Sequence, residues 1–134
     1  MAYKAEIGSI SSGTMRSEDL IPDFAWVLNQ LADGKEHIRL IWEAGEITDF
    51  DSEYADEILS ELMDALNEYA PPYCYFGSHE GDGADYGFWP IWDQLDELPR
   101  VPAGEEHPEG EHLMVNDHGN VDLYCGEEHI WSVV

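Results

Sequence analysis

Basic residues are what this sequence has least of. Five Lys and Arg stand against 30 Asp and Glu, which gives a formal net charge of −25 over 134 residues. Beyond Arg39 the only base is Arg100. Nucleic acids and anionic lipids carry the same sign of charge, so such a surface repels them. The shortage excludes a basic groove for DNA or RNA, and it predicts a cationic partner, either a protein surface or metal ions.

Cysteine and long apolar runs are scarce as well. Cys74 and Cys125 are far apart and match no metal-binding spacing, and both lie in apolar, strand-like contexts. We therefore expect two buried free thiols in a reducing compartment. Met1 to Ile10 lacks the apolar core of a signal peptide, and no apolar run approaches the length of a membrane span. These absences predict a soluble cytoplasmic protein.

Apolar residues are nevertheless plentiful, at 43% hydrophobic and 12% aromatic. Acidic chains that stay disordered are poor in aromatic and β-branched residues, so we expect this one to fold. The length is typical of one domain, and we predict a single domain over residues 1–134. Five tryptophans are expected to anchor the core or an interface: Trp26, Trp42, Trp89, Trp92 and Trp131.

Apolar periodicity predicts two long helices. In residues 51–69 apolar side chains recur at spacings of three and four, which indicates one buried helix face; they are Tyr54, Ile58, Leu62, Ala65 and Tyr69. Residues 17–33 carry a similar stripe. Ser17 is the predicted N-cap of that helix, and Gly34 is its predicted stop.

Alternating apolar residues predict the strands. They lie at residues 3–10, 36–43, 73–76, 86–92, 112–115, 121–124 and 129–133, with a glycine-rich loop at 77–87. Short turns join the last three strands, so residues 112–134 are expected to form a three-stranded antiparallel meander. The predicted fold class is α+β, an antiparallel sheet ending in this meander, with the two main helices packed on one face.

The outer face of the helix at 51–69 is the unusual feature of the sequence. It carries six acids and no base: Glu53, Asp56, Glu57, Glu61, Asp64 and Glu68. Two carboxylates about 6 Å apart in water cost each other roughly 0.7 kcal/mol before salt screening. Residues four apart on a helix are separated by about 6 Å of axial rise, which is on the order of the gap between neighbouring phosphates along a nucleic-acid strand. A second acidic set runs through Asp93, Asp96, Glu97, Glu105, Glu106, Glu109 and Glu111, so two rows would imitate the two strands of a duplex.

The stretch 78–85 offers an alternative function. It places His79, Glu80, Asp82 and Asp85 close together, which favours a divalent-metal site and a small metal-dependent enzyme or metal-binding protein; His118, beside Asp117, would add a general base. The spacing matches neither a calcium loop nor a zinc-protease helix. We therefore interpret the stretch as a glycine-rich hairpin, and predict no catalytic residue, no metal and no cofactor.

Three stretches resemble segments of small acidic proteins carried by bacteriophages and plasmids, namely residues 70–77, 81–89 and 115–121. That resemblance implies no particular activity. In size and charge the chain is also similar to phage anti-CRISPR and anti-restriction proteins that mimic DNA. The second resemblance implies an inhibitor acting in the cytoplasm of a bacterial host cell.

The function we predict is a non-enzymatic DNA mimic. It would block the basic nucleic-acid-binding groove of a host defence complex, of the CRISPR or restriction type, or of another DNA-binding protein. The predicted contact residues are the six helical acids together with Asp93, Asp96 and Glu97. Besides the metal-dependent protein, the alternatives are a homodimeric interaction protein and an acidic domain adapted to high salt. The protein would be a monomer or homodimer that binds neither nucleic acid nor membrane.

Overall fold

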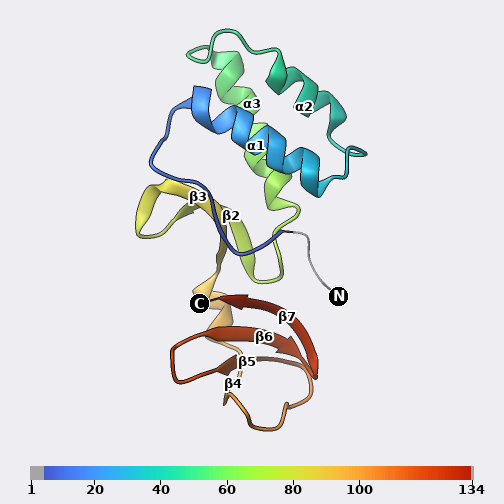
Figure 1. The fold of residues 1–134 in the computed structure, drawn as a ribbon, viewed down its shortest axis with the longest axis vertical. Coiled ribbons are helices and arrows are strands. Elements are labelled where there is room, and N and C mark those ends of the chain that lie inside the picture. The colour runs from blue at the N-terminus through green and yellow to red at the C-terminus, as the bar shows by residue number, and fades with distance from the viewer. Residues whose placement is uncertain (1–4, 134) are drawn as a thin grey trace.

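The computed structural model describes residues 5–133, which form four helices and two sheets (Figure 1). The helices are α1 (Ser17–Leu31), α2 (Ile38–Gly45), α3 (Glu53–Asn67) and α4 (Trp92–Leu95). The first sheet is antiparallel, in the order β1-β3-β2, with β1 (Gly8–Ser11), β2 (Cys74–His79) and β3 (Asp82–Pro90). The second has the order β4-β5-β6-β7, with β4 (Arg100–Pro102), β5 (Glu111–Val115), β6 (Val121–Cys125) and β7 (Glu128–Val133). The predicted α+β class is confirmed, and no helix in residues 5–133 is long and apolar enough to cross a membrane.

Helices α1 and α3 pack on the first sheet around an aromatic core. The Phe24 ring of α1 stands edge-on to Phe76 of β2, with centroids 5.1 Å apart, and Phe76 meets Phe88 of β3 at the same separation. Phe24 and Phe88 are completely or almost completely buried. Burying a side chain of this size stabilises the fold by about 1.5–3 kcal/mol, so these rings hold the helices against the sheet.

The C-terminal sheet has a hydrophobic cluster of its own. Leu95 of α4, Leu113 of β5 and Leu123 of β6 are fully buried in it, beside Trp131 of β7. The Trp131 indole Nε1 donates a hydrogen bond of 2.7 Å to the carbonyl oxygen of Pro72, which precedes β2. This bond ties the second sheet to the base of the first.

The predicted meander is confirmed for β5, β6 and β7, which pair antiparallel in sequence order. The sheet as a whole is mixed, because β4 adds to β5 in parallel orientation. Such a parallel edge strand was not predicted. β4 has only three residues and ends in Pro102, which an edge strand tolerates because that position needs no ladder hydrogen bond.

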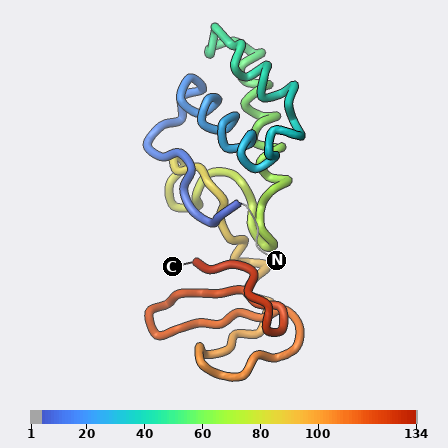
Figure 2. The backbone as a smooth tube through the Cα atoms, turned by 45° about the vertical axis from the view of Figure 1, so that its right-hand side comes forward, coloured from blue at the N-terminus to red at the C-terminus, as the bar shows by residue number. Residues whose placement is uncertain are grey.

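The prediction that both long helices cover the sheet containing the meander is wrong. The helices cover the β1-β3-β2 sheet, and the meander lies in the other half of the molecule (Figure 2). The reason is that the β2–β3 hairpin presents Phe76 and Phe88 to α1 and α3, whereas the meander buries its apolar side chains against α4. The single-domain assignment of residues 1–134 stays a prediction.

The predicted strand at 36–43 is also wrong, because the chain forms α2 there. Asp33, Gly34 and His37 all have positive φ, and they turn the chain between α1 and α2. In the helix, Leu40, Ile41 and Ala44 face the core between α1 and α3. A run with so many large apolar residues satisfies both the strand and the helix period, and packing against two helices decides between them.

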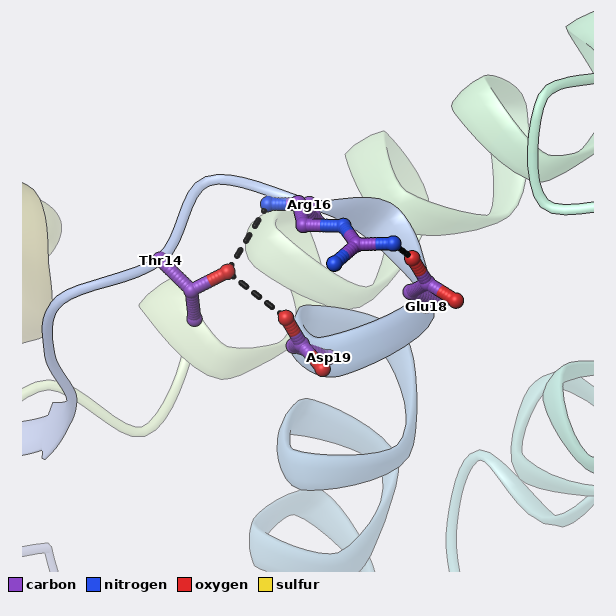
Figure 3. Close-up of polar contacts among 4 residues, drawn as sticks. All are labelled: Thr14, Arg16, Glu18 and Asp19. Carbon is purple, nitrogen blue, oxygen red and sulfur yellow. Dashed lines mark hydrogen bonds and ion pairs between the residues drawn. The ribbon is translucent and has the colours of Figure 1, made fainter.

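Side chains of the preceding loop fix the start of α1. The N-cap residue is Arg16, not the predicted Ser17, and its side chain makes no capping hydrogen bond. The Thr14 hydroxyl instead accepts a hydrogen bond from the Arg16 backbone N–H at 3.2 Å and donates one to Asp19 at 2.7 Å (Figure 3). The Arg16 guanidinium also pairs with Glu18. Both acids lie in the first turn, where they interact favourably with the helix dipole.

The glycine-rich stretch at 77–87 is mostly strand, and the predicted loop is reduced to a tight turn at residues 80 and 81. At the end of this stretch, Gly87 of β3 pairs with Ser9 of β1. A Cβ at Gly87 would overlap the carbonyl oxygen of Gly8.

The predicted strand at 3–10 is shorter than expected, since β1 covers residues 8–11, and residues 3 and 4 lie outside the described part of the chain.

Replacing Gly87 by alanine is expected to destabilise the protein by about 1–3 kcal/mol or more, because the added methyl group has no room between β1 and β3. The measurement is the free energy of unfolding in urea. The matched control is Gly83→Ala in the same strand, where nothing lies within 4 Å of the added Cβ. Equal stability of the two variants would contradict the close approach of β1 to Gly87.

The two cysteines are free, as predicted, but they differ in exposure. Cys74, the first residue of β2, is half-buried, and burial raises the pKa of its thiol to about 12. Cys125, the last residue of β6, is exposed, so the prediction of two buried thiols is wrong for this residue. It stands at the end of a strand, beside the turn into β7, where the sheet no longer covers it.

The two thiols are expected to react at very different rates with an aromatic disulfide reagent at neutral pH. Cys125 should react at once, whereas Cys74 should react only on unfolding, because the thiolate is the reactive species and burial disfavours it. The variants Cys74→Ser and Cys125→Ser assign the two phases. Similar rates in both variants would show that Cys74 is accessible in the folded protein.

Candidate partner-binding surface

Helix α3 presents its six predicted acids on one exposed face. The Ser52 hydroxyl caps the helix by accepting a hydrogen bond from the Ala55 N–H at 3.1 Å. Ile58, Leu62 and Leu66 bury the opposite face in the core beneath α1. All six carboxylates are exposed, which confirms the predicted orientation; we call them the α3 acid row: Glu53, Asp56, Glu57, Glu61, Asp64 and Glu68.

The α3 acid row has a linear charge density close to that of a nucleic-acid strand. Fifteen residue steps from Glu53 to Glu68 span about 22 Å of helix axis, so the six carboxylates have a mean axial spacing of about 4.5 Å. One strand of B-DNA carries about one phosphate per 3.4 Å of axis. The row therefore has about three quarters of the charge per unit length of one strand.

Few cations neutralise the α3 acid row. Within residues 5–133 no ion pair reaches the first five of its members, and Glu68 alone has a partner, the His37 Nε2, at 3.3 Å. On neighbouring α2, the Arg39 Nε is bound to the Glu43 carboxylate at 3.0 Å. The guanidinium that lines a groove with Glu61 is therefore already paired within its own helix.

Tyr54 lies between the α3 acid row and α2. Partial burial raises the pKa of its phenol above the ordinary value, and the Glu43 and Glu61 carboxylates raise it further. The prediction that Tyr54 belongs to the core face is wrong, since its side chain is 49% exposed. It stands at the edge of the buried stripe, next to Glu53 of the acidic face in the chain. A groove between the two helices continues from there, lined by His37, Arg39, Leu40, Glu43 and Glu61.

The second acidic set is not brought to α3. Asp93, Asp96 and Glu97 are exposed, but they belong to α4 and the turn after it, at the junction with the C-terminal sheet (Figure 1). The remaining acids of the set are exposed in the loop between β4 and β5 and at the start of β5, namely Glu105, Glu106, Glu109 and Glu111. Asp96 is neutralised by Arg100, whose guanidinium lies 2.9 Å from the carboxylate. The two acidic sets therefore belong to different halves of the molecule.

In the alternative metal site at 78–85, three of the four predicted side chains accept hydrogen bonds within the first sheet, and Glu80 is exposed in the turn. The His79 Nδ1 accepts from the Gly81 N–H at 2.9 Å, and Asp82 accepts from the Ala84 N–H at 3.0 Å. Asp85 accepts from the Ser9 hydroxyl of β1. Residues 5–133 contain no group of three or more His, Cys, Asp or Glu side chains arranged to hold a metal ion.

His118, the general base that the metal-dependent alternative would use, lies exposed in the turn between β5 and β6. The Asn116 side-chain oxygen accepts from the backbone N–H groups of His118 and Asn120, at 2.9 and 3.0 Å. These bonds are typical of an Asx turn, in which the asparagine side chain replaces a backbone partner. The histidine is placed there by turn geometry.

Sequence analysis missed a pair of hydrogen-bonded imidazoles, one buried and one half-buried, at the C-terminal sheet. His112 of β5 is completely buried, and its Nδ1 donates to the Gly110 carbonyl oxygen at 3.0 Å. In its neutral form, His112 then accepts at Nε2 from the His107 Nδ1, 3.1 Å away. Tyr124 stacks on His112 with rings 13° apart. The pair anchors the loop before β5 to the sheet, and its five-residue spacing follows no helix or strand period.

Comparison with known proteins adds nothing to this geometry. No protein-family model matches the chain, and neither a curated protein sequence nor a solved structure is detectably similar to it. The candidate surface therefore has to be argued from its own residues.

The spacing of the α3 acid row predicts that it destabilises the free protein. Glu57→Lys replaces two repulsive pairs, with Glu53 and Glu61, by two attractive ones, and is expected to raise the free energy of unfolding by about 0.5–1 kcal/mol at low salt. High salt should remove most of the gain. Urea unfolding at both salt concentrations measures it, with Glu105→Lys in the exposed loop after β4 as the control of equal charge change. A loss of stability in Glu57→Lys would contradict this account.

Proposed function

We propose that the protein is a nucleic-acid mimic that inhibits a DNA-binding protein by occupying its basic groove. One observation carries the proposal: the α3 acid row has about three quarters of the charge density of one DNA strand and is almost free of paired cations. Lys and Arg side chains that line a groove for phosphates would accept these carboxylates in the same way. The chain itself needs to perform no chemistry in this role.

Two physical features support binding through α3. The row stands on a helix whose other face is buried, so its carboxylates are held in position before the partner arrives. The carboxylates repel one another in the free protein, and a cationic groove that surrounds them relieves this repulsion. The relief contributes favourably to the free energy of binding. Binding of this kind weakens steeply as salt rises.

The position of the second acidic set restricts the proposed contact surface to one helix. Asp93, Asp96 and Glu97 stand beside the C-terminal sheet, and Asp96 is paired with Arg100. The surface that we propose as the contact is therefore α3 alone, which imitates one strand and not both. Grooves that hold a single strand, or one strand of a duplex, are the expected targets, within a CRISPR or restriction complex of a bacterial cytoplasm.

The test is competition with DNA on a panel of purified CRISPR effector complexes and restriction enzymes. The wild-type protein is expected to displace DNA from its target at low salt. Glu57→Lys/Glu61→Lys/Asp64→Lys should weaken binding to that target by about 100-fold or more, because three attractive contacts become repulsive. Binding constants measured over a series of salt concentrations should also show a shallower salt dependence for this variant.

The control is Glu105→Lys/Glu106→Lys/Glu109→Lys, which makes the same change in net charge in an exposed loop of the other half. It should retain nearly full inhibition. If the α3 variant inhibits as well as the loop variant, the α3 acid row is not the contact. Unchanged far-ultraviolet circular dichroism in both variants establishes that folding is not the cause of a loss.

A further inference from the structure

Large apolar side chains stand exposed beside the α3 acid row. On α2, Ile38 and Trp42 are one helical turn apart and are 60% and 66% exposed. Arg39 and Glu43, the residues that follow Ile38 and Trp42 in the chain, line a groove with Glu61 of α3. We call Ile38 and Trp42 the Trp42 patch. Adjacent exposed apolar residues with a polar rim are typical of protein interaction sites.

The rim of the Trp42 patch is acidic. Glu43 and Glu61 line the groove beside it, and the one guanidinium in that groove, Arg39, is paired with Glu43. A DNA mimic that worked by charge alone would need no tryptophan at this position. The combination suits a partner that brings both a cation and an apolar side chain.

We infer that the Trp42 patch docks a cationic protein segment, one in which an apolar side chain is flanked by Arg or Lys. The apolar side chain would pack against Ile38 and Trp42. The flanking cations would reach Glu57 and Glu61, and a guanidinium would also be attracted to the Trp42 ring face. The inference rests on the proposed function in one respect only, that the α3 acid row belongs to the same partner surface.

A second copy of this chain fits the patch poorly. Each copy carries a net charge of −25, and the acidic rim would face the same rim across a symmetric dimer. Like charges placed opposite each other at an interface cost free energy, whereas a cationic segment relieves the repulsion already present. Charge complementarity therefore selects a cationic partner over self-association.

Two synthetic probes test the inference. One is a helical peptide with arginines on both sides of a leucine stripe, and the other is an oligoarginine of the same net charge. Trp42→Ala is expected to weaken binding of the amphipathic peptide by about tenfold or more, with an unchanged salt slope, and to leave oligoarginine binding nearly unaltered. The matched control is Trp26→Ala on α1, where the tryptophan is also 66% exposed; it should change neither affinity.

Equal affinity of wild-type protein and Trp42→Ala for the amphipathic peptide would overturn the inference, as would an equal loss in Trp26→Ala. Sedimentation gives a second check. A wild-type dimer that becomes a monomer in Trp42→Ala would assign the patch to self-association and so also overturn it. The two proposals fail separately, because competition with DNA tests the α3 acid row and the Trp42→Ala loss tests the patch.

Discussion

Burial of one face of α3 is the interaction on which the rest of the structure depends. Ile58, Leu62 and Leu66 are held in the core formed with α1 and the aromatic side chains of the first sheet. The same helix carries six like charges on its outer face, and an isolated helix with that pattern would be disfavoured by its own repulsion. Apolar burial at about 1.5–3 kcal/mol for each large side chain exceeds the repulsion of neighbouring exposed carboxylates, so the row is tolerated and kept rigid.

The two apolar clusters divide the molecule into halves with different surfaces. The helical half carries the α3 acid row and the Trp42 patch, both on or beside α2 and α3. In the C-terminal half, Arg100 binds Asp96, and the buried His112 bonds Gly110 and His107. The loop after β4 carries exposed acids, but no large apolar side chain is exposed among residues 100–133. Unpaired charge and exposed aromatic surface thus meet in the helical half, where a partner would gain most from contact.

The regular features of the fold could be predicted because they depend on local patterns. The stripes of α1 and α3 have helical periods, and short turns mark the three strands of the meander. The α3 acid row followed from the same period, because a residue opposite a buried stripe faces solvent. The site at the Trp42 patch was missed because four large apolar residues between Ile38 and Trp42 are compatible with a strand as well as a helix.

The sequence by itself determined which stretches are amphipathic, where the chain turns, and that one helix face is acidic without bases. Those properties reside in residues close together in the chain. Only the tertiary structure decided that residues 38–45 are helical, that the helices cover the β1-β3-β2 sheet, and that Asp93, Asp96 and Glu97 stand apart from α3. These outcomes depend on which distant apolar surfaces meet, and the burial that results outweighs the local preference of a short segment.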